Sequence, residues 1–168
     1  MIDVCNEKGM IVIDEFFDGW MYHKNGNSND YATWFNKTIE EGNEILGAED
    51  GMTWAEFDLK ATVGRGQNDP AIIMWSLGNE IQEGAGGSGY DEKAAELIQW
   101  TKEVDDTRIL TIGSNAVKNG SSEHISIANQ LTEVGGASGT NYSNGSSYDS
   151  LHNRYPNWNL YGSERRQQ

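Results

Sequence analysis

The sequence predicts an α/β fold in which parallel strands form one sheet. Short apolar runs, typical of strands buried on both faces, alternate with segments whose apolar residues recur at helical spacing. This alternation is typical of right-handed β-α-β crossovers, which build parallel sheets. A chain of 168 residues is long enough for one hydrophobic core. We therefore expect one globular unit of the α/β class.

Five strands are expected from the apolar runs. Three of these runs are continuous: MIVI at residues 10–13, AIIMWSL at 71–77 and ILTI at 109–112. Two weaker candidates are GTNY at residues 139–142 and LYG at 160–162.

Two helices are expected in the first half of the chain. Residues 1–8 have the pattern of the last turns of an amphipathic helix. Thr53 and Glu56 form a capping box at the start of a second helix. That helix should run for about ten residues, until Gly64 and Gly66 break it.

Two further helices are expected in the second half. One begins near residues 88–91, and a short one covers residues 148–155. Between them, residues 113–138 are rich in Ser, Asn and Gly, so we expect them to form a surface stretch.

Two architectures can hold such a sheet: an open doubly wound sheet and a closed (β/α)8 barrel. A dinucleotide-binding sheet carries a G-x-G-x-x-G turn directly after its first strand. GAGGSG at residues 84–89 fits that pattern loosely and begins several residues past a strand end, so we interpret it as a flexible loop. The polar residues favour the barrel, because barrel enzymes place their active sites at the C-terminal ends of the strands. Those at expected strand ends are Asp14, Glu15, Asn79, Glu80, Asn141, Tyr142 and Glu164.

Composition limits the classes of partner. The net charge of -14, from 26 acidic and 12 basic residues, repels nucleic acids and anionic membranes. No apolar run approaches the ~20 residues of a membrane-spanning helix, and Cys5 alone cannot form an internal disulfide. The three histidines lack metal-ligand spacing and are expected at the surface: His23, His124 and His152. We therefore expect no nucleic-acid or membrane partner. The 26 acidic residues leave a Mg²⁺ or Ca²⁺ ion open as an alternative, but nothing in their spacing demands one, so we expect no metal and no cofactor.

Glu80 and Glu164 stand at two expected strand ends, 84 residues apart in the sequence. A closed barrel would aim both at one mouth, where paired carboxylates suggest hydrolysis of a glycosidic bond. In a retaining enzyme the two carboxyls lie about 5 to 5.5 Å apart. One attacks the anomeric carbon, while the other protonates the leaving oxygen and later deprotonates water. Their pKa values must differ for these roles.

Four segments, in this order, resemble the catalytic barrel of glycoside hydrolase family 2, and most closely its Gram-positive β-galactosidase branch. They are CNEKGMIVIDEFFDGW at residues 5–20, PAIIMWSLGNE at 70–80, GTNY at 139–142 and YGSE at 161–164. The resemblance implies that residues 1–168 are part of a catalytic TIM barrel, from about its third to its seventh strand. It implies a retaining exo-β-galactosidase that needs no cofactor.

The resemblance also implies a role for each of five residues. Glu80 is the general acid/base and Glu164 the nucleophile. Asn79 hydrogen-bonds the 2-hydroxyl of the sugar, and Tyr142 orients the nucleophile. Trp20 is a candidate platform on which a sugar ring stacks. The structural alternatives are that Asn79 satisfies loop backbone, that Tyr142 is a buried tyrosine, and that Trp20 packs within its loop.

Among the departures from the family pattern, two bear on the extent of the barrel and on the site. The chain lacks counterparts of barrel strands one, two and eight and of the accessory β-sandwich domains, which we expect in a longer parent chain. Arg165 and Arg166 follow Glu164, where the family has a small or hydroxyl residue, so we expect a truncation, frameshift or read error at residues 165–168. The branch contains cytoplasmic and surface-displayed bacterial enzymes, so the compartment stays open.

Two functions of different class follow. In the first, the parent protein cleaves terminal β-linked galactose from an oligosaccharide or glycan, with β-glucuronides and β-mannosides as alternative substrates. In the second, the isolated chain is a partial barrel with at most weak sugar binding. Because the sheet of such a barrel has open edges, we expect the isolated chain to be unstable or oligomeric and to show little or no hydrolysis.

Overall fold

Five parallel strands form the sheet in the structure, a computed structural model that describes residues 1–164. They are β1 (Val12–Glu15), β2 (Ile72–Asn79), β3 (Ile109–Ser114), β4 (Ser138–Asn141) and β5 (Leu160–Glu164). All predicted strands are present, with ends shifted by one or two residues from the predicted ones. The predicted irregularity at residues 165–168 lies outside the described residues.

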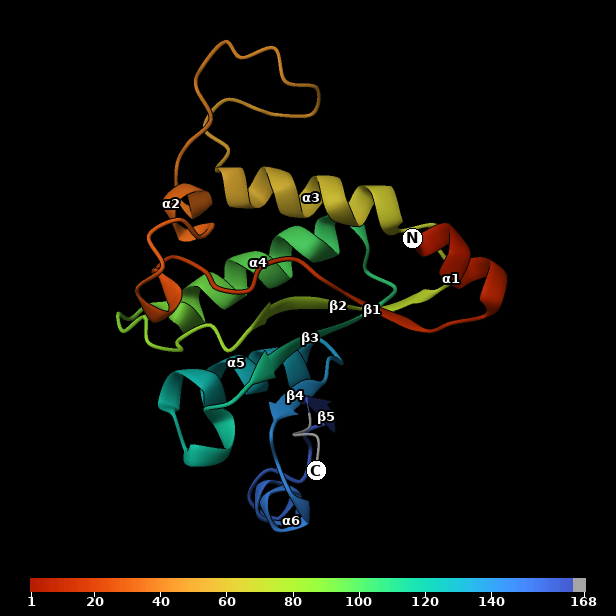
Figure 1. The fold of residues 1–168 in the computed structure, drawn as a ribbon, viewed down its shortest axis with the longest axis vertical. Helices are drawn as coiled ribbons and strands as arrows, with labels where there is room; N and C mark the ends of the chain where they lie inside the picture. The colour runs from red at the N-terminus through yellow and green to blue at the C-terminus, as the bar shows by residue number, and fades with distance from the viewer. Residues whose placement is uncertain (165–168) are drawn as a thin grey trace.

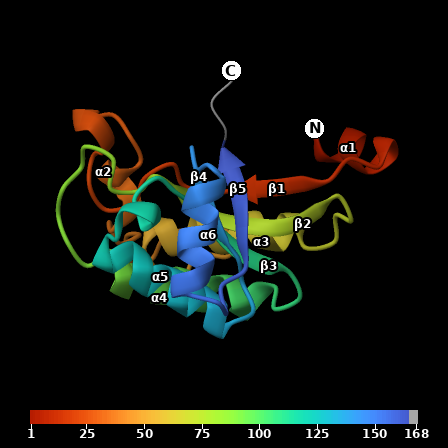
Figure 2. The ribbon, with the colours of Figure 1, turned by 90° about the horizontal axis from the view of Figure 1, so that it is seen from below.

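The strands pair in chain order, β1-β2-β3-β4-β5, and each neighbouring pair is parallel. A doubly wound sheet reverses its strand order at a switch point, whereas a (β/α)8 barrel keeps consecutive strands adjacent. Figure 2 shows the strands fanning strongly, so that β5 runs steeply across the direction of β1. The prediction of an incomplete TIM barrel is confirmed.

Helices connect the strands. They are α1 (Ile2–Lys8), α2 (Ala32–Phe35), α3 (Trp54–Gly66), α4 (Tyr90–Val104), α5 (Ser122–Glu133) and α6 (Gly145–Arg154), with short 3-10 turns η1 (Lys24–Gly26) and η2 (Val117–Asn119). Helices α3, α4 and α5 pack against one face of the sheet, whereas α1 precedes β1 and lies beyond the end of the sheet (Figure 1). Helix α4 contacts both α3 and α5. Within residues 1–164, no helix combines the length and the apolar character that crossing a membrane requires.

Helix α3 begins as the capping box predicts but ends later. The Thr53 hydroxyl accepts a hydrogen bond of 3.2 Å from the Glu56 amide. The helix passes through Gly64 to Gly66 and reaches 13 residues. A Cβ atom on Gly66 would lie 2.9 Å from Cη2 of Trp75, so this glycine makes room for the buried indole.

The predicted surface stretch at residues 113–138 is wrong, because it contains helix α5. One side of α5 buries Ile127, Ala128 and Leu131 at helical spacing. A parallel connection between β3 and β4 needs a crossover, which α5 supplies. His124, expected at the surface, is 2% exposed, and its Nδ1 lies 2.7 Å from Oγ of Ser114. Burial lowers the pKa of His124 to about 4.

Asp105 and Arg108 tie together the connections at the N-terminal ends of the strands. The buried Asp105 carboxylate accepts hydrogen bonds from Nε1 of Trp75 (2.9 Å), the amide of Thr107 (2.9 Å) and Nη1 of Arg108 (2.6 Å). The Arg108 guanidinium also donates to backbone carbonyls that precede or begin β2, those of Gln67 (2.7 Å), Asp69 (3.0 Å) and Ile72 (2.7 Å). Removing the buried carboxylate would leave the partly buried Arg108 cation without its counter-charge.

Replacing Asp105 is expected to destabilise the fold strongly. For Asp105→Ala we expect a loss of about 3 to 5 kcal/mol in the free energy of unfolding at pH 7. Although burial opposes it, hydrogen bonds from Thr107, Trp75 and Arg108 hold the pKa of Asp105 well below its ordinary value. Asp105 therefore makes its full contribution to the free energy of unfolding above its unfolded-state pKa of about 3.9. This contribution is lost as the pH falls through the lower pKa of the folded state.

Urea unfolding followed by tryptophan fluorescence at pH 7 and at pH 3 measures this contribution. Asp106→Ala is the matched control, since Asp106 is the exposed neighbour, and it should change stability by less than about 0.5 kcal/mol. Equal effects of the two substitutions at pH 7 would contradict the proposed role of Asp105.

Candidate active site

Three strand ends bring four of the predicted site residues to one edge of the sheet. Asn79 and Glu80 lie at the end of β2, Tyr142 directly follows β4, and Glu164 ends β5. Parallel strands present their C-terminal ends at the same edge, which is the face on which barrel enzymes build their sites. The fold thus gathers side chains that are up to 85 residues apart in the sequence.

Asn141, the last residue of β4, connects these strand ends. Its side-chain amide donates to Oδ1 of Asn79 (2.8 Å) and to Oε1 of Glu80 (2.9 Å), while its Oδ1 accepts from the hydroxyl of Ser163. Asn141 is fully buried. It therefore fixes the position of the Glu80 carboxyl. Sequence reasoning gave it no role, although it lies within the quoted GTNY segment.

The backbone is strained at two of these positions. Glu80 has φ 47° and Tyr142 has φ 54°, both in the left-handed region that non-glycine residues rarely adopt. Among residues 1–164, Asn25 is the one other non-glycine residue with a positive φ. Each such conformation costs about 1 to 3 kcal/mol and persists only where the surroundings hold it. The left-handed turns re-aim the two side chains at the strand ends.

The Glu80 carboxyl has an unusual electrostatic environment. It is 5% exposed, and this burial raises its pKa above the ordinary value. The Asn141 amide opposes the rise, whereas the carboxylates of Glu83 and Glu164 increase it. The neutral acid is therefore favoured up to a higher pH than in an ordinary glutamate, so that Glu80 can donate a proton.

Tyr142 holds the Glu164 carboxylate. The Tyr142 hydroxyl donates to Oε2 of Glu164, and its backbone amide donates to the Glu164 carbonyl at 2.9 Å. The hydrogen bond to the carboxylate raises the pKa of Tyr142 to about 12, so the phenol stays a donor at neutral pH. The alternative of a buried tyrosine is wrong, because Tyr142 is partly exposed. A carboxylate oriented in this way can serve as a nucleophile.

A cavity of about 280 Å³ lies beside Asn79 and Glu164. Its other lining residues come from four strands: Ile13, Glu15, Ser76, Gly113, Tyr161 and Ser163. Gly113 is required for its shape, because a Cβ atom there would lie 2.7 Å from Oδ1 of Asn79. Among residues 1–164, no group of three or more His, Cys, Asp or Glu side chains is arranged to hold a metal ion.

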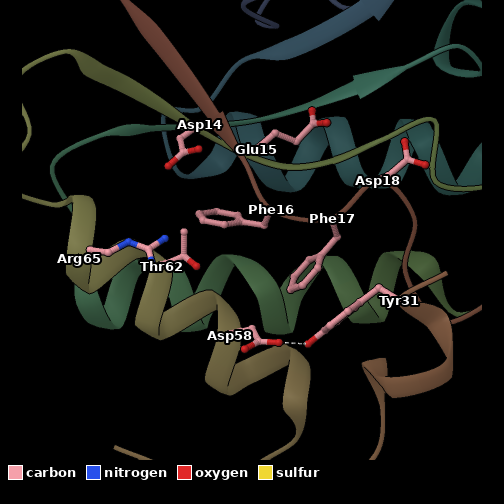
Figure 3. A pocket seen from close by; sticks show the side chains of 9 residues that line it. All are labelled: Asp14, Glu15, Phe16, Phe17, Asp18, Tyr31, Asp58, Thr62 and Arg65. Carbon is pink, nitrogen blue, oxygen red and sulfur yellow. Dashed lines mark hydrogen bonds between the residues drawn. The ribbon is translucent and has the colours of Figure 1, made fainter. Parts of the chain in front are cut away.

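The end of β1 divides its two acidic residues between opposite faces. Glu15 faces the cavity, where its Oε2 accepts a 2.9 Å hydrogen bond from Ser76, whereas Asp14 lies on the side of Arg65 (Figure 3). This follows from the alternation of side chains along a strand. Burial raises the pKa of both carboxyls. A second hollow, of about 390 Å³, lies beside the end of β1, where the Tyr31 hydroxyl donates to Asp58 (Figure 3).

Trp20 does not reach the cavity, so the expectation of a sugar-stacking platform is corrected. The side chain is fully buried, and its indole N–H donates to the Leu77 carbonyl at 2.7 Å. A Cβ atom on Gly78 would lie 2.7 Å from Nε1 of Trp20, so the glycine admits the ring to the core. The structural alternative, packing, describes this residue.

Comparisons with known proteins identify the family and the fold of the chain. Residues 1–149 match the family model described as "Glycosyl hydrolases family 2, TIM barrel domain". A Formosa agariphila protein with the provisional name β-glucuronidase is 32% identical over 112 residues, covering 67% of this chain and 8% of that protein. A β-galactosidase of Bacteroides ovatus is 27% identical over 165 residues, covering 80% of this chain and 17% of that protein.

A solved structure of a glycosyl hydrolase family 2 member from Bacteroides cellulosilyticus superposes with a TM-score of 0.69 at 28% identity. The match covers 98% of this chain and 18% of that chain. This chain thus spans less than a fifth of the length of each of these proteins. The family match and the shared fold together show that the chain belongs to glycosyl hydrolase family 2 and forms part of its TIM barrel.

Proposed function

We propose that the full-length protein is a retaining exo-glycosidase that hydrolyses terminal β-D-galactosides. The observation that carries the proposal is the pair of carboxyls, Glu80 and Glu164, that two strand ends direct to one site in different environments. Glu80 is buried with a raised pKa, and Glu164 accepts a hydrogen bond from a phenol. Such a difference between two carboxyls is what an acid and a nucleophile require.

The reaction follows a double displacement. The Glu164 carboxylate attacks the anomeric carbon and forms a glycosyl ester, while Glu80 gives its proton to the departing oxygen. Glu80, now ionised, takes a proton from water, and that water releases the sugar from Glu164. Asn79, whose Oδ1 is held by Asn141, lines the cavity and is proposed to bind the sugar 2-hydroxyl.

The lining of the cavity favours a neutral sugar. Among the described residues that line it, Glu15 and Glu164 are acidic and none is basic. A glucuronide carboxylate placed there would face like charges without a partner. The similarity to a protein named as a β-galactosidase supports galactose as the sugar. The alternative substrates are β-glucuronides and β-mannosides. β-Glucuronides should be assayed too, because one relative has the provisional name β-glucuronidase.

The proposal concerns the parent protein. In this chain, β1 and β5 each have a strand neighbour on one side only. We propose that further barrel strands and β-sandwich domains of the parent complete the site, and that the isolated chain is an incomplete barrel with little or no turnover. The assignment of residues 150–168 to the same domain stays a prediction, supported by the pairing of β5 with β4.

Glu80→Gln is expected to remove general acid catalysis in the parent protein. For methyl β-galactoside, whose leaving group needs a proton, kcat/KM should fall by about 10²- to 10⁴-fold. For 2,4-dinitrophenyl β-galactoside, the leaving group departs as a stable anion. The rate constant of the first step, transfer of the sugar to Glu164, should therefore fall much less. Steady-state and pre-steady-state kinetics of both substrates measure the difference. Glu133→Gln, at an exposed position at the end of α5, is the control and should leave both values unchanged. Equal losses on both substrates would contradict an acid role for Glu80.

Glu83→Gln is expected to shift the alkaline side of the pH profile to lower pH. The Glu83 carboxylate raises the pKa of Glu80. Its removal therefore lowers that pKa, so Glu80 loses its catalytic proton at a lower pH and kcat/KM begins to fall earlier. The pH dependence of kcat/KM for methyl β-galactoside, whose leaving group needs the Glu80 proton, measures the shift against wild type. An alkaline limb that stays in place or moves upward would overturn this explanation of the raised pKa.

A further inference from the structure

Two lysine side chains hold the backbone at the strand ends that carry the site. Nζ of Lys24 donates to the Asn79 carbonyl at 3.0 Å. Nζ of Lys118 donates to the Asn141 carbonyl at 2.6 Å and to the Tyr142 carbonyl at 3.1 Å. Each ammonium thus binds the carbonyl directly before a left-handed residue, Glu80 in one case and Tyr142 in the other.

We propose that Lys24 and Lys118 are positioning residues, each of which holds one strand end in the left-handed conformation that presents a reacting group. The role in catalysis rests on the proposed function, in which Glu80 is the acid/base and Tyr142 orients Glu164. An ammonium offers three N–H donors, and its hydrogen bonds to carbonyls are charge-assisted. It can therefore hold a backbone that is strained when unsupported.

Lys24 supports the end of β2 from the loop that follows β1. Its side chain is 11% exposed and is held by Asp18, whose Oδ1 lies 2.7 Å from Nζ. The adjacent amide of Asn25 donates to the Glu83 carbonyl at 2.9 Å. The η1 turn and the turn at residues 80–83 therefore brace each other. Removal of the Lys24 ammonium is expected to loosen the turn that presents Glu80 and to leave the end of β4 in place.

Lys118 supports the end of β4 from η2, the turn after β3. This turn is fixed by the Ser114 hydroxyl oxygen, which accepts hydrogen bonds from the amides of Ala116 (3.2 Å) and Val117 (3.0 Å). The Lys118 ammonium also lies 5.9 Å from the centre of the Tyr142 ring. The strand end that it holds carries two relevant contacts, from Asn141 to Glu80 and from Tyr142 to Glu164. Its loss is expected to disturb both carboxyls.

The two lysines therefore have different predicted effects on catalysis in the parent protein. In Lys24→Met, kcat/KM on methyl β-galactoside should fall at least tenfold more than on 2,4-dinitrophenyl β-galactoside, because only the first substrate depends on proton donation by Glu80. In Lys118→Met, both substrates should lose activity, on the order of 10²-fold, because the nucleophile is displaced as well. Lys60→Met is the matched control, since Lys60 pairs with Glu56 and Glu103 on the outer helices.

Hydrogen–deuterium exchange provides a readout that does not depend on activity. Lys24→Met should speed amide exchange by about tenfold or more in peptides covering residues 80–83 and leave residues 141–143 unchanged. Lys118→Met should give the opposite pattern, and Lys60→Met should change neither segment. If a methionine variant does not fold, Lys24→Gln and Lys118→Gln, which also remove the charge, are expected to show the same pattern.

The outcomes separate this proposal from the proposed function. Suppose that the parent protein is active and is impaired by Glu80→Gln, as proposed. If Lys24→Met and Lys118→Met then have effects as small as that of Lys60→Met, the positioning role alone is overturned. A parent without turnover on any of the β-glycosides would overturn the proposed function, and exchange would then decide whether the lysines hold the strand ends. Unchanged exchange at both segments would overturn the positioning role in either case.

Discussion

Parallel pairing of five strands in chain order is the constraint on which the rest of the structure depends. All five strands begin at the same edge of the sheet, so a crossover must connect each strand to the next. Every crossover returns the chain to that edge, where Asp105 and Arg108 join neighbouring connections. The opposite ends, where the strands stop, then converge. Glu80 and Glu164 lie close enough to interact for this reason alone, because no local feature of the sequence connects them.

Convergence of the strand ends is not sufficient for a defined site, because side chains at the ends of strands are free to point in several directions. Asn141 removes much of this freedom by binding Asn79 and Glu80 together, and the left-handed backbone at Glu80 and Tyr142 sets the direction in which each side chain leaves its strand. The strain of these turns is offset by hydrogen bonds from neighbouring loops. The site is therefore built from the loops after β1 and β3 as much as from the strands.

The sequence predicted the strands because buried parallel strands are nearly continuous apolar runs, and it predicted which acids lie at their ends. Helix α5 was missed because its apolar face is narrow. Ser, Asn and Thr residues surround Ile127 and Leu131 in the sequence, so the helical spacing of the apolar residues is hard to recognise. The position of Trp20 after a strand indicated proximity to the site, but only the packing against Leu77 and Gly78 shows that its ring turns into the core. The contacts of Lys24 and Lys118 span 55 and 23 residues and leave no local pattern.

Glu164 is proposed to form a covalent bond with the sugar, while Glu80 donates a proton to the leaving oxygen and then accepts one from water. The parent protein is incubated with 2-deoxy-2-fluoro-β-D-galactosyl fluoride. This reagent slows both the formation and the hydrolysis of the glycosyl ester, but its fluoride is a good leaving group, so the ester accumulates. Mass spectrometry of the digested protein locates the added sugar. We predict one added fluorogalactosyl group, on the peptide that contains Glu164. A protein that turns over galactosides yet carries the label on another residue, or carries none, would contradict the account.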